Sequence, residues 1–148
     1  MSRTLFFLLI TTLCYQCKPS DLSEPSKQEI LKAEKAMNAL ASTSGFNTAL
    51  LAFADDSLIK PEDGKLPVIG KLALEELWQR SPGTKDISWA PLRVVASKSG
   101  DIGYTFGNWK FVTRDTTYHG NYFTAWEKQT DGSWKWTLDG GNNTPAPR

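Results

Sequence analysis

The sequence has few of the side chains that build thiol and metal chemistry. Its 148 residues include only two cysteines, Cys14 and Cys17, and one histidine, His119. Because both cysteines lie near the N-terminus, the rest of the chain can hold no disulfide, thiol nucleophile or thiolate metal site. A metal site there would need carboxylates alone, and no carboxylate cluster has ligand spacing. We therefore expect no metal and no cofactor.

An excess of charge of one sign is also missing. The formal net charge is +1, and no basic stripe alternates with aromatic residues, as it would in a nucleic-acid binder. The length suits one globular domain that buries roughly two thirds of its unfolded surface. We expect a single domain with no nucleic-acid partner.

The first residues form an apolar segment that does not belong to that domain. Arg3 precedes the run from Leu5 to Leu13, which is too short to span a hydrocarbon core of ~30 Å but suits the apolar region of a signal peptide. We interpret residues 1–16 as a signal peptide and residues 17–26, rich in Pro and Ser, as a polar tether.

The arrangement around Cys17 resembles a bacterial lipoprotein leader. This resemblance implies lipidation of Cys17 and anchoring in the cell envelope, on the periplasmic side or at the cell surface, with no other contact to the membrane. Gln16 stands where Gly, Ala or Ser is usual, and Cys14 where Leu is usual. Cleaved, soluble export and a cytoplasmic protein with an apolar start remain the alternatives.

Three helices are expected in the first half of the body. Ser26 and Glu29 form a capping-box pattern, and apolar residues recur at helical spacing up to Gly45. A shorter helix is expected over 46–54, followed by an extended piece over 57–60. A third helix is expected over 70–80, with Leu74, Leu77 and Trp78 as its apolar stripe.

The second half predicts four long antiparallel strands over 87–97, 102–113, 118–129 and 134–139. Short polar turns separate them, the last being Asp131-Gly132. Strands of this length bend, and Gly103, Gly107 and Gly120 are the expected bend positions. The pattern predicts an α+β fold in which the helices close the concave face of a strongly bent antiparallel sheet.

These pieces together resemble a known fold family. The segments that carry the resemblance are FADDSLIKPEDG (53–64), GKLALEELW (70–78), GYTFGNW (103–109), GNYFTAWEKQTDGSWKW (120–136) and LDGG (138–141). They are similar to the cone-shaped α+β fold of the nuclear transport factor 2-like superfamily, most closely its DUF4440 and SnoaL-like group, which includes ketosteroid-isomerase-like enzymes. The resemblance covers residues 27–141, and we expect residues 142–148 to be a disordered tail. Because the superfamily also includes dehydratases, cyclases, hydrolases and non-catalytic scaffolds, the fold does not give the function.

At the positions that correspond to the catalytic residues of steroid isomerases, this sequence has other residues. The resemblance places Pro61 where their catalytic aspartate stands, and Glu62 and Asp63 follow in a loop where carboxylates are usually solvated. It places Met37 and Asn38 nearest to their oxyanion tyrosine, and neither replaces a phenol. Steroid-type isomerisation is therefore not expected.

Two other titratable sites have a structural interpretation. Asp55 and Asp56 are adjacent, so their side chains point in different directions, and an Asp at a helix-to-strand junction commonly accepts backbone N–H groups in an Asx turn. His119 would have to carry any imidazole chemistry, but it starts a strand, where a lone histidine is usually exposed.

Aromatic residues on the strands predict a pocket. Buried Trp and Tyr rings need partners for their N–H and O–H groups, so polar residues among them are candidates for lining a cavity. The expected pocket residues are Tyr104, Trp109, Tyr122 and Asp139, with Trp78 as a lid. Pairing with backbone N–H groups of the Gly140-Gly141 turn would explain Asp139 equally well.

The sequence favours a protein that binds a small, mostly apolar molecule. The alternative is a small isomerase, dehydratase or hydrolase that uses carboxylate or histidine acid/base chemistry, with Asp139 and His119 as the catalytic candidates. Alternating aromatics on the long strands leave more apolar surface than three short helices cover. We therefore also expect a homodimer formed through the convex face of the sheet.

Overall fold

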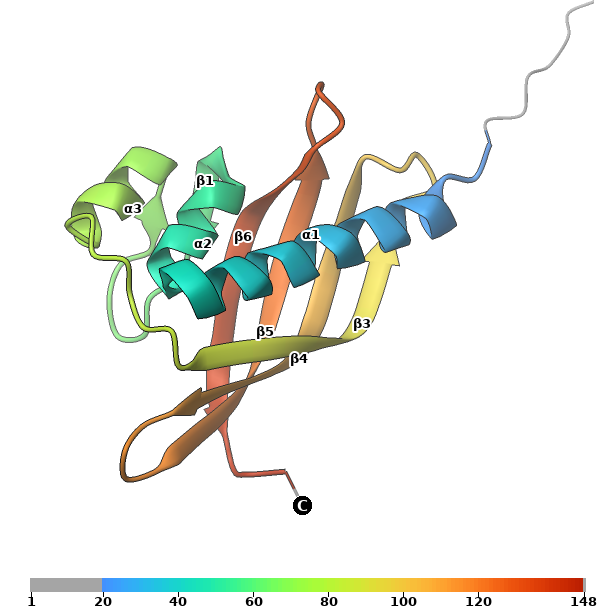
Figure 1. The fold of residues 1–148 in the computed structure, drawn as a ribbon. Helices are drawn as coiled ribbons and strands as arrows, with labels where there is room; N and C mark the ends of the chain where they lie inside the picture. Colours follow the sequence, from blue (N-terminus) through green and yellow to red (C-terminus); the bar gives the residue numbers. More distant parts are fainter. Residues whose placement is uncertain (1–19, 148) are drawn as a thin grey trace, which may run out of the picture.

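The computed structural model describes residues 20–147, which form three helices and six strands (Figure 1). The predicted signal peptide, Cys14 and Cys17 lie outside the described residues. The elements in chain order are α1 (Ser23–Ser44), α2 (Phe46–Phe53), β1 (Ala54–Lys60), β2 (Val68–Ile69), α3 (Lys71–Leu77), β3 (Ile87–Ala96), β4 (Ile102–Val112), β5 (Thr117–Lys128) and β6 (Trp134–Thr144).

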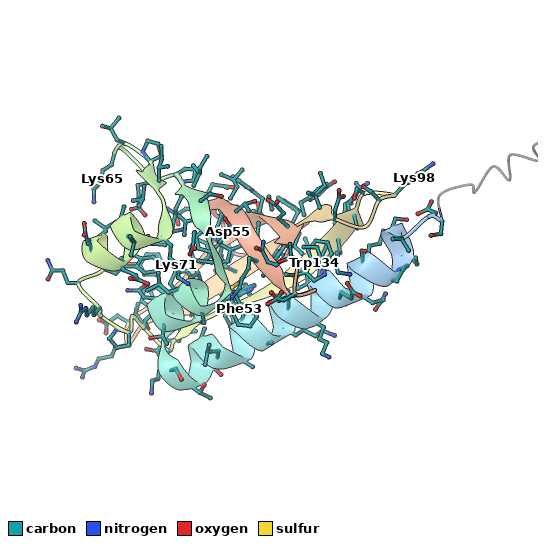
Figure 2. The ribbon with its side chains drawn as sticks, turned by 90° about the horizontal axis from the view of Figure 1, so that it is seen from above. Phe53, Asp55, Lys65, Lys71, Lys98 and Trp134 are labelled. Carbon is teal, nitrogen blue, oxygen red and sulfur yellow. The ribbon has the colours of Figure 1, made fainter. Side chains whose placement is uncertain are left out.

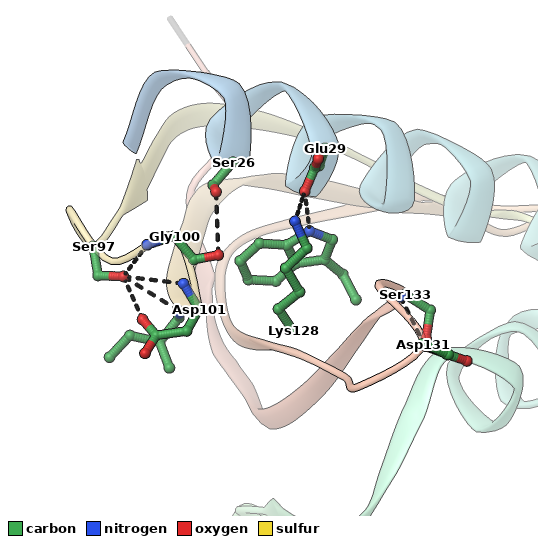
Figure 3. Close-up of polar contacts among 10 residues, drawn as sticks. Ser26, Glu29, Ser97, Gly100, Asp101, Lys128, Asp131 and Ser133 are labelled. Carbon is green, nitrogen blue, oxygen red and sulfur yellow. Dashed lines mark hydrogen bonds and ion pairs between the residues drawn. The ribbon is translucent and has the colours of Figure 1, made fainter. Parts of the chain in front are cut away.

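Helix α1 begins earlier than its sequence pattern predicts. It starts at Ser23, within the expected tether, and Ser26 lies inside the helix. The Ser26 hydroxyl does not cap the helix but donates a hydrogen bond to the Gly100 carbonyl at 3.2 Å (Figure 3). The capping-box prediction is therefore wrong, because a contact with the β3–β4 turn takes the hydroxyl. The helix ends before Gly45, as predicted, at a φ of 99°.

A polar cluster fastens the N-terminal half of α1 to the sheet. One carboxylate oxygen of Glu29 accepts hydrogen bonds from Lys128 Nζ at 2.6 Å and from Trp134 Nε1 at 2.9 Å (Figure 3). These bonds lower the pKa of Glu29, the one from Lys128 most. Together with the bond from Ser26 to Gly100, these contacts join the start of α1 to the sheet.

The six strands form one sheet in the order β2-β1-β6-β5-β4-β3. The four predicted strands are present and antiparallel to their neighbours, but β1 runs parallel to β6, so the sheet is mixed. Strand β6 continues to Thr144, which pairs with His119. The prediction of a tail from residue 142 is therefore wrong for residues 142–144, because pairing with β5 orders them.

Helix α3 is shorter than predicted. It ends at Leu77, and Gln79 and Arg80 have φ values of 49° and 60° in the left-handed region, which stops the helix. Leu74 is buried, whereas Leu77 is 47% exposed, so only part of the expected apolar stripe faces the core.

The core lies between the helices and one face of the bent sheet. Helix α1 crosses this face, and α2 and α3 lie beside β1 and β6 (Figure 1). Buried side chains on α1, α2, β1 and the long strands form one cluster, with Ile30, Leu58, Trp126 and Trp136 fully enclosed. The pairing is irregular at two places, between Pro91 and Arg93 on β3 and at Thr137 on β6, which lies opposite the Ala125-Trp126 step of β5.

Candidate ligand cavity

A cavity of about 620 Å³ opens between the helices and the C-terminal end of β6. This size lies within the usual range of small-molecule sites. Its apolar wall comes from Met37 on α1, Phe46 and Leu50 on α2, and the strand residues Ile87, Trp89 and Trp109. Phe123 borders the cavity from β5, but its alternation is opposite to that of buried Tyr122 and Thr124. Its polar wall consists of Lys60, Glu62, Asp63, Tyr122, Thr124, Asp139, Asn142 and Asn143, with Pro61, Gly64, Gly140 and Gly141 between them.

Asp139 is the centre of the polar wall. Its Oδ2 accepts a hydrogen bond from Lys60 Nζ at 2.9 Å, and its Oδ1 accepts one from Thr124 Oγ1 at 2.8 Å. The side chains of Lys60 and Asp139 are only 14% and 15% exposed. The parallel pairing of β1 with β6 brings this ion pair together, so a bond between residues far apart in sequence fixes the carboxylate in the wall.

Tyr122 carries an unpaired hydroxyl beside this carboxylate. The residue is 7% exposed, and among residues 20–147 its hydroxyl oxygen is the one buried side-chain N or O atom with no hydrogen-bond partner. Burial raises the pKa of Tyr122 well above its ordinary value, and the nearby Glu34 and Asp139 carboxyl groups raise it further. The phenol therefore stays protonated, with its hydroxyl oxygen shielded from the open cavity.

Glu34 lies in the core behind the cavity wall. Its Oε1 accepts a hydrogen bond from Trp89 Nε1 at 2.8 Å, its Oε2 accepts one from Thr105 Oγ1 at 2.9 Å, and Trp126 Nε1 donates to the same threonine oxygen at 3.2 Å. Burial raises the pKa of Glu34, and the donors only partly oppose this effect. Glu34 is close enough to Tyr122 to act on its pKa, but the phenol makes no hydrogen bond of normal geometry to it.

Two glycines shape the aromatic wall. A Cβ atom at Gly120 would collide with the Trp109 ring, and one at Gly107 would lie 2.7 Å from the Tyr122 ring. Trp109 Nε1 also donates to the Asn121 carbonyl at 3.1 Å. The expected bend glycines therefore serve partly to leave space for rings that face the cavity.

The structure divides the predicted site residues into two groups. Trp109, Tyr122 and Asp139 line the cavity, whereas Trp78, Tyr104 and His119 do not. Tyr104 and His119 occupy the opposite alternation on β4 and β5 from buried Thr105 and Tyr122, so they belong to the other face. This corrects the expectation that Tyr104 and His119 are site residues.

Trp78 also has a different place from the one predicted. It follows α3 and packs against Phe46, with ring centroids 6.5 Å apart. Because Phe46 itself lines the cavity, Trp78 supports the wall from behind. The expectation that Trp78 covers the cavity directly is therefore corrected.

The Asp55-Asp56 pair lies outside the cavity. Asp55 follows Phe53 at the junction of α2 and β1 (Figure 2), where its Oδ1 accepts bonds from Ser57 N at 2.8 Å and Ser57 Oγ at 2.6 Å. These bonds from Ser57 lower the pKa of Asp55. The predicted Asx-type arrangement is present, and neither aspartate is a cavity residue.

All but one of the positions compared with steroid isomerases line the cavity. Met37, Pro61, Glu62 and Asp63 are all lining residues. Asn38 donates to the Trp89 carbonyl at 2.8 Å instead of facing the cavity. The helix thus presents a thioether where an oxyanion donor would be needed, and the available carboxylates lie on the loop after β1.

Sequence reasoning missed Lys60 and Glu34. Lys60 was within the expected extended piece, but the parallel pairing that brings it to Asp139 could not be read from the sequence. Glu34 had a detectable signal, because a glutamate among apolar positions on a buried helix face needs donors from another element. Within residues 20–147, no group of three or more His, Cys, Asp or Glu could hold a metal ion.

Comparisons with known proteins agree on the fold. No family model and no curated protein matches the chain. A ketosteroid isomerase-like protein from Erwinia carotovora atroseptica is 20% identical, with a TM-score of 0.59 over 80% of this chain and 98% of that one. A nuclear transport factor 2-like protein of unknown function from Pseudomonas putida is 16% identical, with a TM-score of 0.67 over 81% and 87%. The CaMKII hub of S. rosetta is 13% identical, with a TM-score of 0.59 over 79% and 95%.

The chain therefore has the cone-shaped α+β fold of the nuclear transport factor 2-like superfamily, as its sequence predicts. At these identities the similarity shows the fold alone. What the cavity does has to be argued from its own residues.

Proposed function

We propose that this protein binds a small, mostly apolar molecule in the cavity, without catalysing a fast reaction on it. The observation that carries the proposal is the cavity of about 620 Å³, in which an apolar wall meets the hydrogen-bonded polar groups of Lys60, Thr124 and Asp139. A cavity of this size with a few fixed polar groups is typical of a small-molecule site.

The chemistry of the wall supports binding more than turnover. Both oxygens of Asp139 already accept hydrogen bonds, from Lys60 and from Thr124, which hold the carboxylate in place. His119, the other predicted catalytic residue, does not line the cavity. The cavity therefore has groups that orient a ligand, but both oxygens of its central carboxylate are already engaged.

Binding can be tested with naphthylmethanol, a neutral probe that has an aromatic body and one hydroxyl group. We expect calorimetry to give a dissociation constant of about 1 mM or below. Asn142→Trp places an indole at a lining position and should abolish binding. Asn108→Trp, on the same sheet but outside the lining, is the matched control. No binding to the unmodified protein, or equal binding to both variants, would refute the proposal.

Acid/base catalysis at Asp139 is the second candidate, and the position of this carboxylate in the cavity wall supports it. Asp139→Asn keeps the shape and removes the charge, with Asp55→Asn as a control outside the cavity. If a substrate is found, a loss of turnover in Asp139→Asn with binding retained would favour an isomerase, dehydratase or hydrolase. Unchanged binding and turnover would make Asp139 structural.

Export with a lipid anchor at Cys17 is proposed from the sequence of residues 1–17. Within residues 20–147, no helix has the length and apolar character needed to cross a membrane. Intact-mass analysis of protein from the native membrane fraction should give a chain that starts at an acylated Cys17. A chain that keeps Met1, or one that starts elsewhere without lipid, would contradict this proposal.

A homodimer through the sheet face opposite the helices is also proposed. Tyr104, Phe106 and Phe123 are 41%, 38% and 40% exposed on this face, and Phe106 pairs directly with Phe123 across β4 and β5. Exposed apolar groups gathered in this way commonly mark an interface. Sedimentation at micromolar concentration should detect a dimer, and Phe106→Glu should convert it to a monomer. A monomer without the mutation would refute the proposal.

A further inference from the structure

A buried carboxyl group behind the cavity carries an inference that rests on the proposed binding function and concerns how the cavity wall is held. Glu34 on α1 is 1% exposed and does not line the cavity. Burying a carboxyl group costs stability, and replacing a buried polar pair with apolar groups of the same shape is often neutral or stabilising. Stability of the core alone therefore gives no reason for a glutamate at this position.

The indole that bonds to Glu34 is one that lines the cavity. Trp136, in the closed core, donates its Nε1–H to the Leu50 carbonyl at 2.8 Å, as an indole can in any core. Trp89 instead donates to Glu34 Oε1 at 2.8 Å, and Thr105 Oγ1 donates to Glu34 Oε2 at 2.9 Å. The second bond restricts rotation of the carboxyl group, so the indole N–H points to an acceptor that is itself fixed. Buried networks with every member paired make a core rigid.

Helix α1 holds Trp89 at a second point as well. Asn38, one helical turn after Glu34 and thus on the same face, donates from its Nδ2 to the Trp89 carbonyl at 2.8 Å. The ring of Phe46 meets the Trp89 ring edge-on, with centroids 5.9 Å apart and planes at 89°. Because β3 is an edge strand of the sheet, Trp89 has a neighbouring strand on one side only. The bonds from α1 therefore fix both its main chain and its side chain.

We propose that Glu34 is a positioning residue of the ligand cavity, which holds the indole N–H of Trp89 and so fixes the ring against which an apolar ligand packs. A wall that is ordered before binding spares the ligand the cost of ordering this side chain. Glu34 thus raises the affinity without touching the ligand.

A matched pair of variants on α1 tests the proposal. Glu34→Met keeps a side chain of similar length but leaves only a weak acceptor for the Trp89 N–H. Glu29→Met is the control, because Glu29 also accepts a bond from an indole N–H, that of Trp134 at 2.9 Å, but lies outside the cavity lining. Calorimetry with naphthylmethanol should show about fivefold weaker binding in Glu34→Met and a change below about twofold in Glu29→Met.

The outcomes separate this inference from the proposed function. No binding to the unmodified protein overturns both. Equal binding by the unmodified protein and Glu34→Met overturns the positioning role and leaves the binding function intact. An equal loss in Glu34→Met and Glu29→Met would mean that any loosening of α1 weakens binding, and it too overturns the positioning role.

Two further readouts distinguish positioning from a general effect on the fold. Trp89→Phe keeps an aromatic ring that needs no acceptor, so adding Glu34→Met to it should change the affinity by less than about twofold. In ¹⁵N-labelled protein, Trp89→Phe also identifies the Trp89 indole N–H signal by its loss. This N–H should exchange with solvent about tenfold faster in Glu34→Met than in Glu29→Met. Additive losses of affinity, or equal exchange in these two variants, would contradict the proposal.

Glu34→Gln decides the question if Glu34→Met does not fold. Its single amide oxygen can serve only one of the two donors, Trp89 and Thr105. We then expect binding of naphthylmethanol to weaken by about twofold to threefold, against no change in Glu29→Gln. Equal affinities in these two variants would overturn the proposal.

Discussion

Aromatic side chains at the two ends of the sheet have different surroundings. At the end near the start of α1, Trp134 donates to Glu29, and Trp136 in the core donates to the Leu50 carbonyl. At the cavity end, Trp109 and Tyr122 border empty space, and the Tyr122 hydroxyl has no partner. The first region therefore resembles an ordinary core, whereas the second keeps a polar group unsatisfied.

This difference separates stability from function within one sheet. Where every buried donor is paired and every ring is enclosed, a mutation should mainly change the free energy of unfolding. Where side chains line the cavity, a mutation should mainly change ligand binding. Four changes test this comparison, from the largest expected effect on stability to the smallest.

The largest effect is expected for Trp136→Ala in the closed core. Trp136 is fully buried, and its loss leaves a large void and removes the donor to the Leu50 carbonyl. We expect the free energy of unfolding in urea to fall by about 3–5 kcal/mol. A loss below about 1 kcal/mol would mean that this region repacks and is not the rigid part of the molecule.

A pH-dependent effect is expected for Glu34→Gln, behind the cavity wall. Because burial raises the pKa of Glu34 above its ordinary value of 4.5, the folded protein holds a proton that the unfolded chain releases. Wild-type stability should therefore fall as the pH rises from 4.5 through the folded-state pKa. Glutamine mimics the protonated form, so the stability of the variant relative to wild type should increase over this range. Urea unfolding between about pH 4 and about pH 8 measures the difference, and a constant difference would contradict the prediction.

A smaller effect is expected for Glu29→Ala, at the surface of the closed end. The change removes the bonds from Lys128 and Trp134 that fasten α1 (Figure 3). Because these groups are partly exposed, the loss should be about 1 kcal/mol or less in thermal or urea unfolding. High salt should weaken the effect, and a loss as large as that of Trp136→Ala would contradict the comparison.

The smallest effect on stability is expected for Tyr122→Phe in the cavity. Its hydroxyl makes no hydrogen bond within the protein, so no bond is lost and the free energy of unfolding should fall by less than about 0.5 kcal/mol. Binding of naphthylmethanol should stay within about twofold, because the ring that lines the cavity is kept. Tyr104→Phe removes the same group from the other face and should change neither quantity. A loss of binding in Tyr122→Phe alone would show that the hydroxyl reaches the ligand.

Local patterns in the sequence are enough to predict most of the elements and half of the expected site. The α+β class, the four long strands, the end of α1 at Gly45 and the Asx turn at Asp55 all follow from periodicity and turn chemistry, which act over a few residues. Trp109, Tyr122 and Asp139 were predicted to line a pocket because polar and aromatic residues alternate on these strands.

What the tertiary structure decided depends on contacts between residues far apart in sequence. Parallel pairing of β1 with β6 brings Lys60 within hydrogen-bond distance of Asp139. Packing of α1 on the sheet gives Glu34 its hydrogen-bond donors, Trp89 and Thr105. Side-chain alternation on a strand defines two faces but does not say which one meets the helices, and so Tyr104 and His119 were assigned to the wrong face. Only the assembled sheet leaves the Tyr122 hydroxyl free, because the position of every possible partner is set by long-range packing.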